Sequence, residues 1–163
     1  MTSRKTAADP AQGAGARRAL SRAYDEPFLP RADAMTPYER IGGAAPVAQI
    51  VRRFYELMDT DPAYARLRAM HARDLTPMVE SLTGFLTAWM GGPRDWFATR
   101  PGACMMSLHA AIPGIDRDTA DQWIAAMTRA AAEAIPEDVD LRTSVLEALW
   151  RMAHGMAARA AAA

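Results

Sequence analysis

The chain has 163 residues, which is the size of one domain. Its 19 Lys and Arg residues balance 19 Asp and Glu residues, so a strongly basic surface is excluded and nucleic acid is not an expected partner. No apolar run approaches the roughly 20 residues of a membrane span, so we expect no membrane insertion. The only cysteine, Cys104, cannot form an internal disulfide, which suits a cytoplasmic location.

Residues 1–34 differ from the rest of the chain. They are rich in small residues and arginine, and Asp9 is the only acidic residue before Asp25. We expect a flexible N-terminal extension, with an acidic-poor, amphipathic transit peptide as the alternative. Residues 35–163 are then expected to form the folded domain.

Abundant alanine and methionine, with few β-branched residues, favour an all-α fold. Thr36 followed by Pro37 predicts the start of a short helix that ends at Gly42-Gly43. The next helix is expected at about 46–58, where apolar residues recur at i, i+3, i+4, i+7 and i+8. A short turn of helix should follow, through about residue 67.

Further helices are predicted at about 75–90, near 96–97, and at about 104–109, 116–134 and 138–158. Gly91-Gly92-Pro93 should end the first of these, and Asp116 should cap the helix at 116–134. The last helix is expected to bury a face made of Val145, Leu146, Leu149, Trp150, Ala153 and Met156. Such unequal helix lengths do not fit an even four-helix bundle.

Three residues that could carry chemistry occur in the order Tyr55, His109 and Trp123. His109 closes a short segment after an irregular stretch, and a neutral imidazole is a common ligand of haem iron. A lone histidine is, however, more often a packed or surface residue. Tyr55 and Trp123 also fall on apolar helix stripes, where ordinary core packing would explain them.

With Gly91-Gly92-Pro93 between the first two residues, this ordered set resembles the truncated haemoglobins of group II. The resemblance covers about residues 36–160 and implies a globin-like, two-over-two helical sandwich. It also implies haem b as the cofactor, His109 as the iron ligand, and O2 or another small diatomic molecule as the bound ligand. Tyr55, Trp123 and His71 would then line a polar distal pocket.

The same resemblance assigns the apolar lining of the haem pocket to Phe54, Met78, Leu82, Phe85, Trp89 and Leu108. Two departures concern the haem propionates. The segment before His109 lacks the arginines that family members usually carry, and Ser81 replaces a common basic residue. Propionate contacts are therefore expected elsewhere, from Arg94, Arg100 or Thr76.

The expected function is reversible binding of O2, for oxygen binding or transport, with release slowed by hydrogen bonds from the distal pocket. One alternative is a redox enzyme, an NO dioxygenase or peroxidase, which would need a reductase because the chain carries no flavin or nicotinamide motif. Another is a haem-free globin-like interaction or sensor module, which the missing propionate bases favour. A plain helical domain is a third. The protein is expected to be a monomer or a homodimer.

Overall fold

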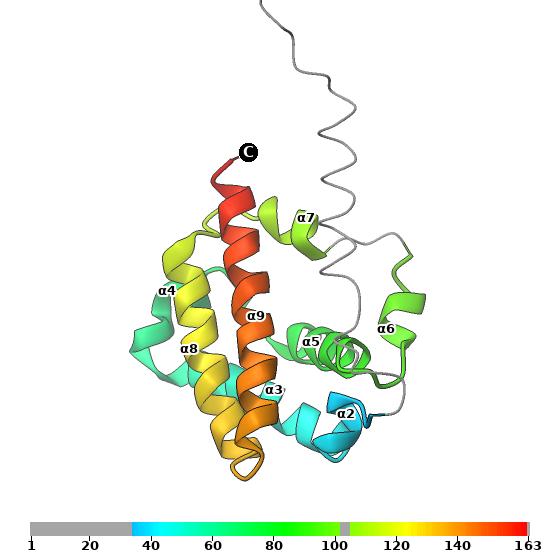
Figure 1. The fold of residues 1–163 in the computed structure, drawn as a ribbon. Helices are drawn as coiled ribbons and strands as arrows, with labels where there is room; N and C mark the ends of the chain where they lie inside the picture. Colours follow the sequence, from blue (N-terminus) through cyan, green and yellow to red (C-terminus); the bar gives the residue numbers. More distant parts are fainter. Residues whose placement is uncertain (1–33, 102–104, 163) are drawn as a thin grey trace, which may run out of the picture.

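The computed structural model describes residues 34–101 and 105–162, without the side chains at 106, 107 and 110. Cys104 and the part of the predicted N-terminal extension before Ala34 lie outside the described residues. Every regular element in the described residues is helical, which confirms the all-α class (Figure 1). The elements are α2 (Pro37–Arg40), α3 (Ala44–Thr60), the 3-10 turn η1 (Pro62–Tyr64), α4 (Ala65–Ala69), α5 (Thr76–Trp89), α6 (Asp95–Ala98), α7 (Met105–Ala110), α8 (Arg117–Ala134) and α9 (Val139–Ala160).

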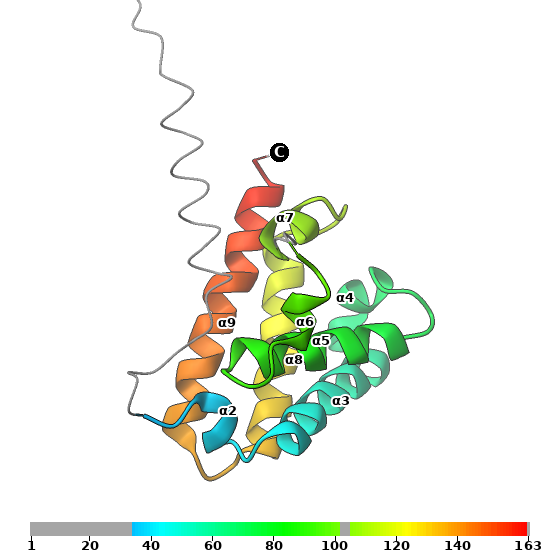
Figure 2. The same cartoon turned by 90° about the vertical axis from the view of Figure 1, so that its right-hand side faces the viewer.

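Two pairs of long helices form the sandwich. The helices α8 and α9 run side by side, while α3 and α5 make the second pair and cross them (Figures 1 and 2). Since α3 packs on both α5 and α8, it joins the two pairs. The short α7 packs on α9. This arrangement confirms the two-over-two sandwich that the sequence led us to expect.

The core is densest where α3 meets α8. The largest fully buried side chains are Phe54, Met58, Met127, Val47 and Val51, and all come from these two helices. Burying each apolar side chain of this size contributes about 1.5–3 kcal/mol. The apolar stripe predicted for α3 therefore faces the centre of the domain.

The predicted helix caps are confirmed. The hydroxyl of Thr36 accepts a hydrogen bond from the Glu39 backbone N–H at 3.1 Å, and the Glu39 carboxylate accepts from the Thr36 N–H at 2.8 Å. At the start of α8, Asp116 and Thr119 make the same reciprocal pair, each bond 3.0 Å long. Both boundaries could be read from the sequence because a capping box involves only neighbouring residues.

The buried face expected on α9 is confirmed only in part: Val145 and Leu149 are buried, Leu146, Ala153 and Met156 are half-buried, and Trp150 was wrong. Trp150 is 48% exposed and stacks on His154, with ring centroids 4.1 Å apart. The buried stripe instead passes through Leu141, Val145, Leu149 and Met152. Trp150 lies one residue beyond this stripe, about 100° around the helix, where it faces away from the core.

Gly91 and Gly92 allow α2 to pack against the end of α5. Gly91 has a φ of +95°, and a Cβ atom there would lie 2.8 Å from Cβ of Thr36. A Cβ atom on Gly92 would lie 2.8 Å from the ring of Tyr38, whose backbone N–H donates to the Met90 carbonyl at 3.0 Å. The glycine pair thus ends the helix and also makes room for the preceding segment.

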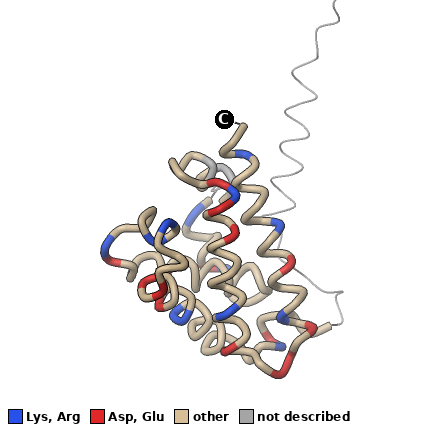
Figure 3. Tube along the Cα trace, turned by 90° about the vertical axis from the view of Figure 1, so that its left-hand side faces the viewer, with Lys and Arg blue, Asp and Glu red and all other residues tan. Residues whose placement is uncertain are grey.

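Charged residues of both signs are interspersed over the helices (Figure 3). Some of them join α3 to α8, such as Arg53 and Glu133 at 2.6 Å. Within the described residues, no helix combines the length and apolarity needed to cross a membrane.

We predict that Gly91→Ala destabilises the protein more than Gly114→Ala does. Both glycines have positive φ, so alanine costs about 1–2 kcal/mol at either position. Only at Gly91 does the new methyl also meet packed atoms; at Gly114 the nearest atom, Cε of Met70, is 3.8 Å away. Urea unfolding of the two variants tests this, and equal losses would show that contact with Thr36 adds nothing.

Candidate functional site

Three aromatic residues of the predicted distal pocket lie together. Phe54 of α3 packs against Tyr55 with ring centroids 4.9 Å apart, and against Trp123 of α8 at 5.3 Å. Tyr55 in turn meets His71, which follows α4, edge to face at 6.0 Å. The structure therefore brings Tyr55 and His71 together directly and places Trp123 on the other side of Phe54.

The Tyr55 side chain is buried, and its hydroxyl has no partner among the described residues. Tyr55 is 7% exposed, and its hydroxyl forms no hydrogen bond with any residue that the structure describes. Burial raises the pKa of Tyr55 to about 12, which keeps the phenol protonated and able to donate at neutral pH.

His71 presents a lone pair toward the site. Its Nδ1 lies 3.0 Å from the Leu67 carbonyl oxygen, which can only accept, so Nδ1 carries the proton. Burial lowers the pKa of His71 more than the Leu67 carbonyl raises it, and the charges of Arg68 and His109 lower it further. A neutral His71 therefore offers Nε2 as an acceptor, which leaves Tyr55 and Trp123 as the donors of the predicted distal set.

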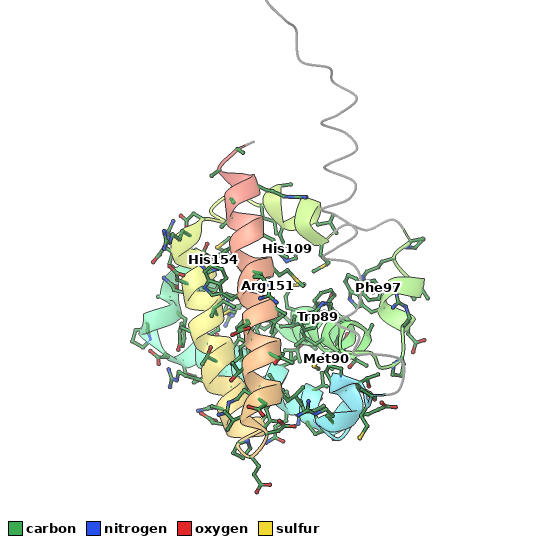
Figure 4. The ribbon with its side chains drawn as sticks, viewed as in Figure 1. Trp89, Met90, Phe97, His109, Arg151 and His154 are labelled. Atoms are coloured by element: carbon green, nitrogen blue, oxygen red, sulfur yellow. The ribbon has the colours of Figure 1, made fainter. Side chains whose placement is uncertain are left out.

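His109 has the same tautomer as His71. Its Nδ1 donates to the Met105 carbonyl at 2.9 Å, four residues earlier in α7. Nε2 of His109 has no hydrogen bond within the described part of the chain, so its lone pair is available. In Figure 4 the imidazole extends from α7 on the side that faces Trp89 of α5.

The predicted lining residues differ in exposure. Phe54, Phe85 and Trp89 are buried, and Leu82 is half-buried. Met78 and Leu108 are 40% and 55% exposed, which is high for large apolar side chains. Phe85 and Trp89 stack on one another at 6.4 Å, and Phe85 also contacts Trp96 of α6. Part of the predicted lining is therefore already packed against α6.

Two of the three predicted propionate partners, Arg94 and Arg100, flank α6, while Thr76 begins α5. Arg94 covers the ring of Phe97 at 5.0 Å, and Arg100 covers Trp96 at 4.8 Å. The indole N–H of Trp96 donates to the hydroxyl of Ser81 at 3.2 Å. The basic residue expected at position 81 is thus replaced by a small one on which the α6 tryptophan packs.

The residues present fit a haem group. Haem iron needs one protein ligand, and His109 supplies a neutral imidazole with its second nitrogen already paired to the backbone. Tyr55 supplies a hydroxyl that has no hydrogen-bond partner within the part of the chain that the structure describes. The described residues contain no cluster of three or more His, Cys, Asp or Glu that could hold a bare metal ion.

Sequence analysis missed two residues that connect the elements of the site. The side-chain oxygen of Gln122, next to Trp123, accepts from the Leu67 backbone N–H at 3.0 Å. Arg68, three residues before His71, donates to several backbone carbonyls of the following loop. The one signal in the sequence was that Arg68 directly follows the apolar Leu67 in an otherwise polar segment.

Comparison with known proteins identifies the family. The model of the bacterial-like globin family matches residues 36–158. The group 2 truncated hemoglobin YjbI of Bacillus subtilis (strain 168) is 31% identical over 91 residues, which is 56% of this chain. That match spans 65% of the curated relative, just under two thirds of its length.

Solved structures with the same fold cover more of the chain. The group II 2-on-2 hemoglobin of Agrobacterium tumefaciens is 35% identical with a TM-score of 0.72, over 78% of this chain and 97% of that one. The cold-adapted truncated hemoglobin of Pseudoalteromonas haloplanktis TAC125 is 30% identical with a TM-score of 0.71, over 75% and 97%. The Bacillus anthracis group II truncated hemoglobin has 26% identity and a TM-score of 0.68, over 76% and 92%.

We predict that Tyr55 makes stability depend on pH in alkaline solution. Its folded pKa of about 12 exceeds the ordinary value of 10.0, so its contribution is complete below pH 10 and is lost as the pH rises toward 12. The free energy of unfolding should fall more steeply across this range in the wild type than in Tyr55→Phe. Urea unfolding at several pH values measures it, and identical slopes would contradict the prediction.

Proposed function

The chain belongs to the bacterial-like globin family, and from this premise we propose that it binds haem b through His109 and reversibly takes up O2 or another small diatomic ligand beside Tyr55. The proposal rests on two groups that could bind a haem iron and its ligand, together with the contact between Tyr55 and His71. Nε2 of His109 and the hydroxyl of Tyr55 are both unpaired within the described residues, and His71 lies between α4 and α5, in contact with Tyr55.

His109 acts as the proximal ligand. Its Nδ1–H is held by the Met105 carbonyl, which fixes both the tautomer and the orientation of the ring. A fixed ring presents Nε2 along one direction and loses little rotational freedom on binding. Haem, when bound, would supply an iron that can bind a diatomic ligand.

Tyr55 and Trp123 provide hydrogen bonds in the distal pocket. The Tyr55 phenol stays protonated because burial raises its pKa, so it can donate to a partly negative ligand atom. The indole N–H of Trp123 can only donate. His71 packs edge to face on Tyr55 and offers Nε2 as an acceptor. Together these groups favour slow release of a polar diatomic ligand such as O2.

The remaining alternatives concern what the bound ligand is used for. Redox turnover as an NO dioxygenase or peroxidase would use the same residues and would need a separate reductase. The cytoplasmic location, the reductase and the choice between monomer and homodimer stay predictions.

The first test is the absorption spectrum of the purified chain with and without added hemin. We expect a sharp Soret band in the wild type and its loss or strong displacement in His109→Ala, because the iron loses its protein ligand. His154→Ala is the matched control, since that imidazole is paired with Asp121 and Trp150 and belongs to the α8–α9 surface.

Two outcomes would contradict haem binding at this site. One is a protein that is folded and colourless after hemin is added, which would favour the haem-free interaction module. The other is a Soret band that does not change in His109→Ala.

We also predict that Tyr55→Phe speeds O2 dissociation. Loss of a charge-assisted hydrogen bond worth about 1.5–3 kcal/mol corresponds to a rate about tenfold to a hundredfold higher. Stopped-flow release from the ferrous protein measures it. Tyr64→Phe is the control, because the hydroxyl of Tyr64 pairs with Arg129 at 3.1 Å, away from His71. Equal rates in the wild type and Tyr55→Phe would reject the role of the phenol.

A further inference from the structure

Arg68, in the last turn of α4, forms hydrogen bonds with the backbone of the loop that carries His71. Its guanidinium donates to the carbonyl of Ala72 at 2.9 Å, to that of Arg73 at 3.2 Å and to that of His71 at 3.4 Å. Its Nε donates to the carboxylate of Asp59 at 2.7 Å. One side chain thus satisfies three consecutive carbonyls and one acid.

These contacts connect α3, which carries Tyr55, with the loop that carries His71. Asp59 lies in the last turn of α3, four residues after Tyr55, so both residues are on one face of that helix. The three carbonyls belong to the loop that begins at His71. The guanidinium therefore sets the distance between the end of α3 and this loop, and with it the 6.0 Å separation of the Tyr55 and His71 rings.

Arginine suits this position better than lysine. Its planar fork offers several donors in fixed directions, whereas an ammonium group is a single point charge. The side chain of Arg68 is 24% exposed, so its hydrogen bonds are partly shielded from water. Arg66 differs although it is on the same helix: it is half-exposed and pairs with Asp116 and Asp118 at the start of α8.

We propose that Arg68 is a positioning residue that holds His71 beside Tyr55 and so sets the polarity of the distal pocket. Its effect on ligand release rests on the haem-globin function proposed above, but its effect on the His71 side chain does not. Without Arg68, three loop carbonyls lose their donors and turn toward water. His71 then leaves the Leu67 carbonyl, and its imidazole no longer faces Tyr55.

The test compares Arg68→Met and Arg68→Lys with the control Arg66→Met in the full-length chain. Nitrogen-15 NMR of the histidine side chains is recorded on the chain as purified and on its hemin-loaded, CO-bound ferrous form. We expect His71 to show a proton on Nδ1 in the wild type and in Arg66→Met, and a mixture of tautomers in Arg68→Met. Arg68→Lys should not restore the wild-type signal, because it lacks the fork.

A double-mutant cycle with His71→Leu links this position to ligand release. We expect His71→Leu to change the O2 dissociation rate by about twofold to tenfold, the range of one neutral hydrogen bond. Arg68→Met should shift the rate in the same direction, and the double variant should match His71→Leu alone. Additive effects would mean that Arg68 does not act through His71, and would overturn the proposal.

The outcomes separate this proposal from haem binding. A His71 signal that is unchanged in Arg68→Met would reject the positioning role of Arg68. A lower melting temperature in that variant would not rescue this role, because it would show only that Arg68 stabilises the fold. If the chain binds no haem, the NMR comparison on the purified chain still decides the positioning role. If Arg68→Met keeps the wild-type Soret band while the His71 signal and the release rate change, both proposals are supported.

Discussion

Packing of α3 against α8 is the constraint on which the rest of the structure depends. Phe54 is fully buried at this contact and touches both Tyr55 and Trp123. Because Tyr55 and Trp123 come from different helices, a shift of α3 along α8 would separate the two proposed distal donors. The ion pair between Arg53 and Glu133 crosses the same contact at the surface. The core and the site therefore share one interface, and Phe54 belongs to both.

Helix geometry determines the chemistry of the histidines. His71, His109 and His154 each bring Nδ1 to a backbone carbonyl four residues earlier, at 3.0, 2.9 and 3.0 Å. Each thus holds its proton on Nδ1 when neutral and presents Nε2 outward. What differs is what Nε2 meets: that of His154 pairs with Asp121 at 2.9 Å. Nε2 of His71 and of His109 makes no hydrogen bond within the described residues, which suits both for a binding site.

The Gly91-Gly92-Pro93 segment shows how a motif can be recognised before its physical role is known. In the sequence it ended a helix and helped to identify a resemblance. In the structure it also lets Thr36 and Tyr38 pack against the end of α5. No pattern near the glycines indicated this contact, because its partners lie more than 50 residues earlier in the chain. The contact of Trp96 with Ser81 of α5 was likewise not indicated by any local pattern, because the two residues belong to different helices.

The sequence by itself determined the helices, their caps and the candidate residues, because apolar periodicity and capping boxes depend only on neighbouring positions. The order of Tyr55, His109 and Trp123 also indicated the family. Only the tertiary structure decided which residues meet. It exposed Trp150, made His71 an acceptor and placed Arg68 between α3 and the loop after α4. These outcomes depend on contacts between distant segments and on which side of each helix the core occupies, and no local pattern encodes either.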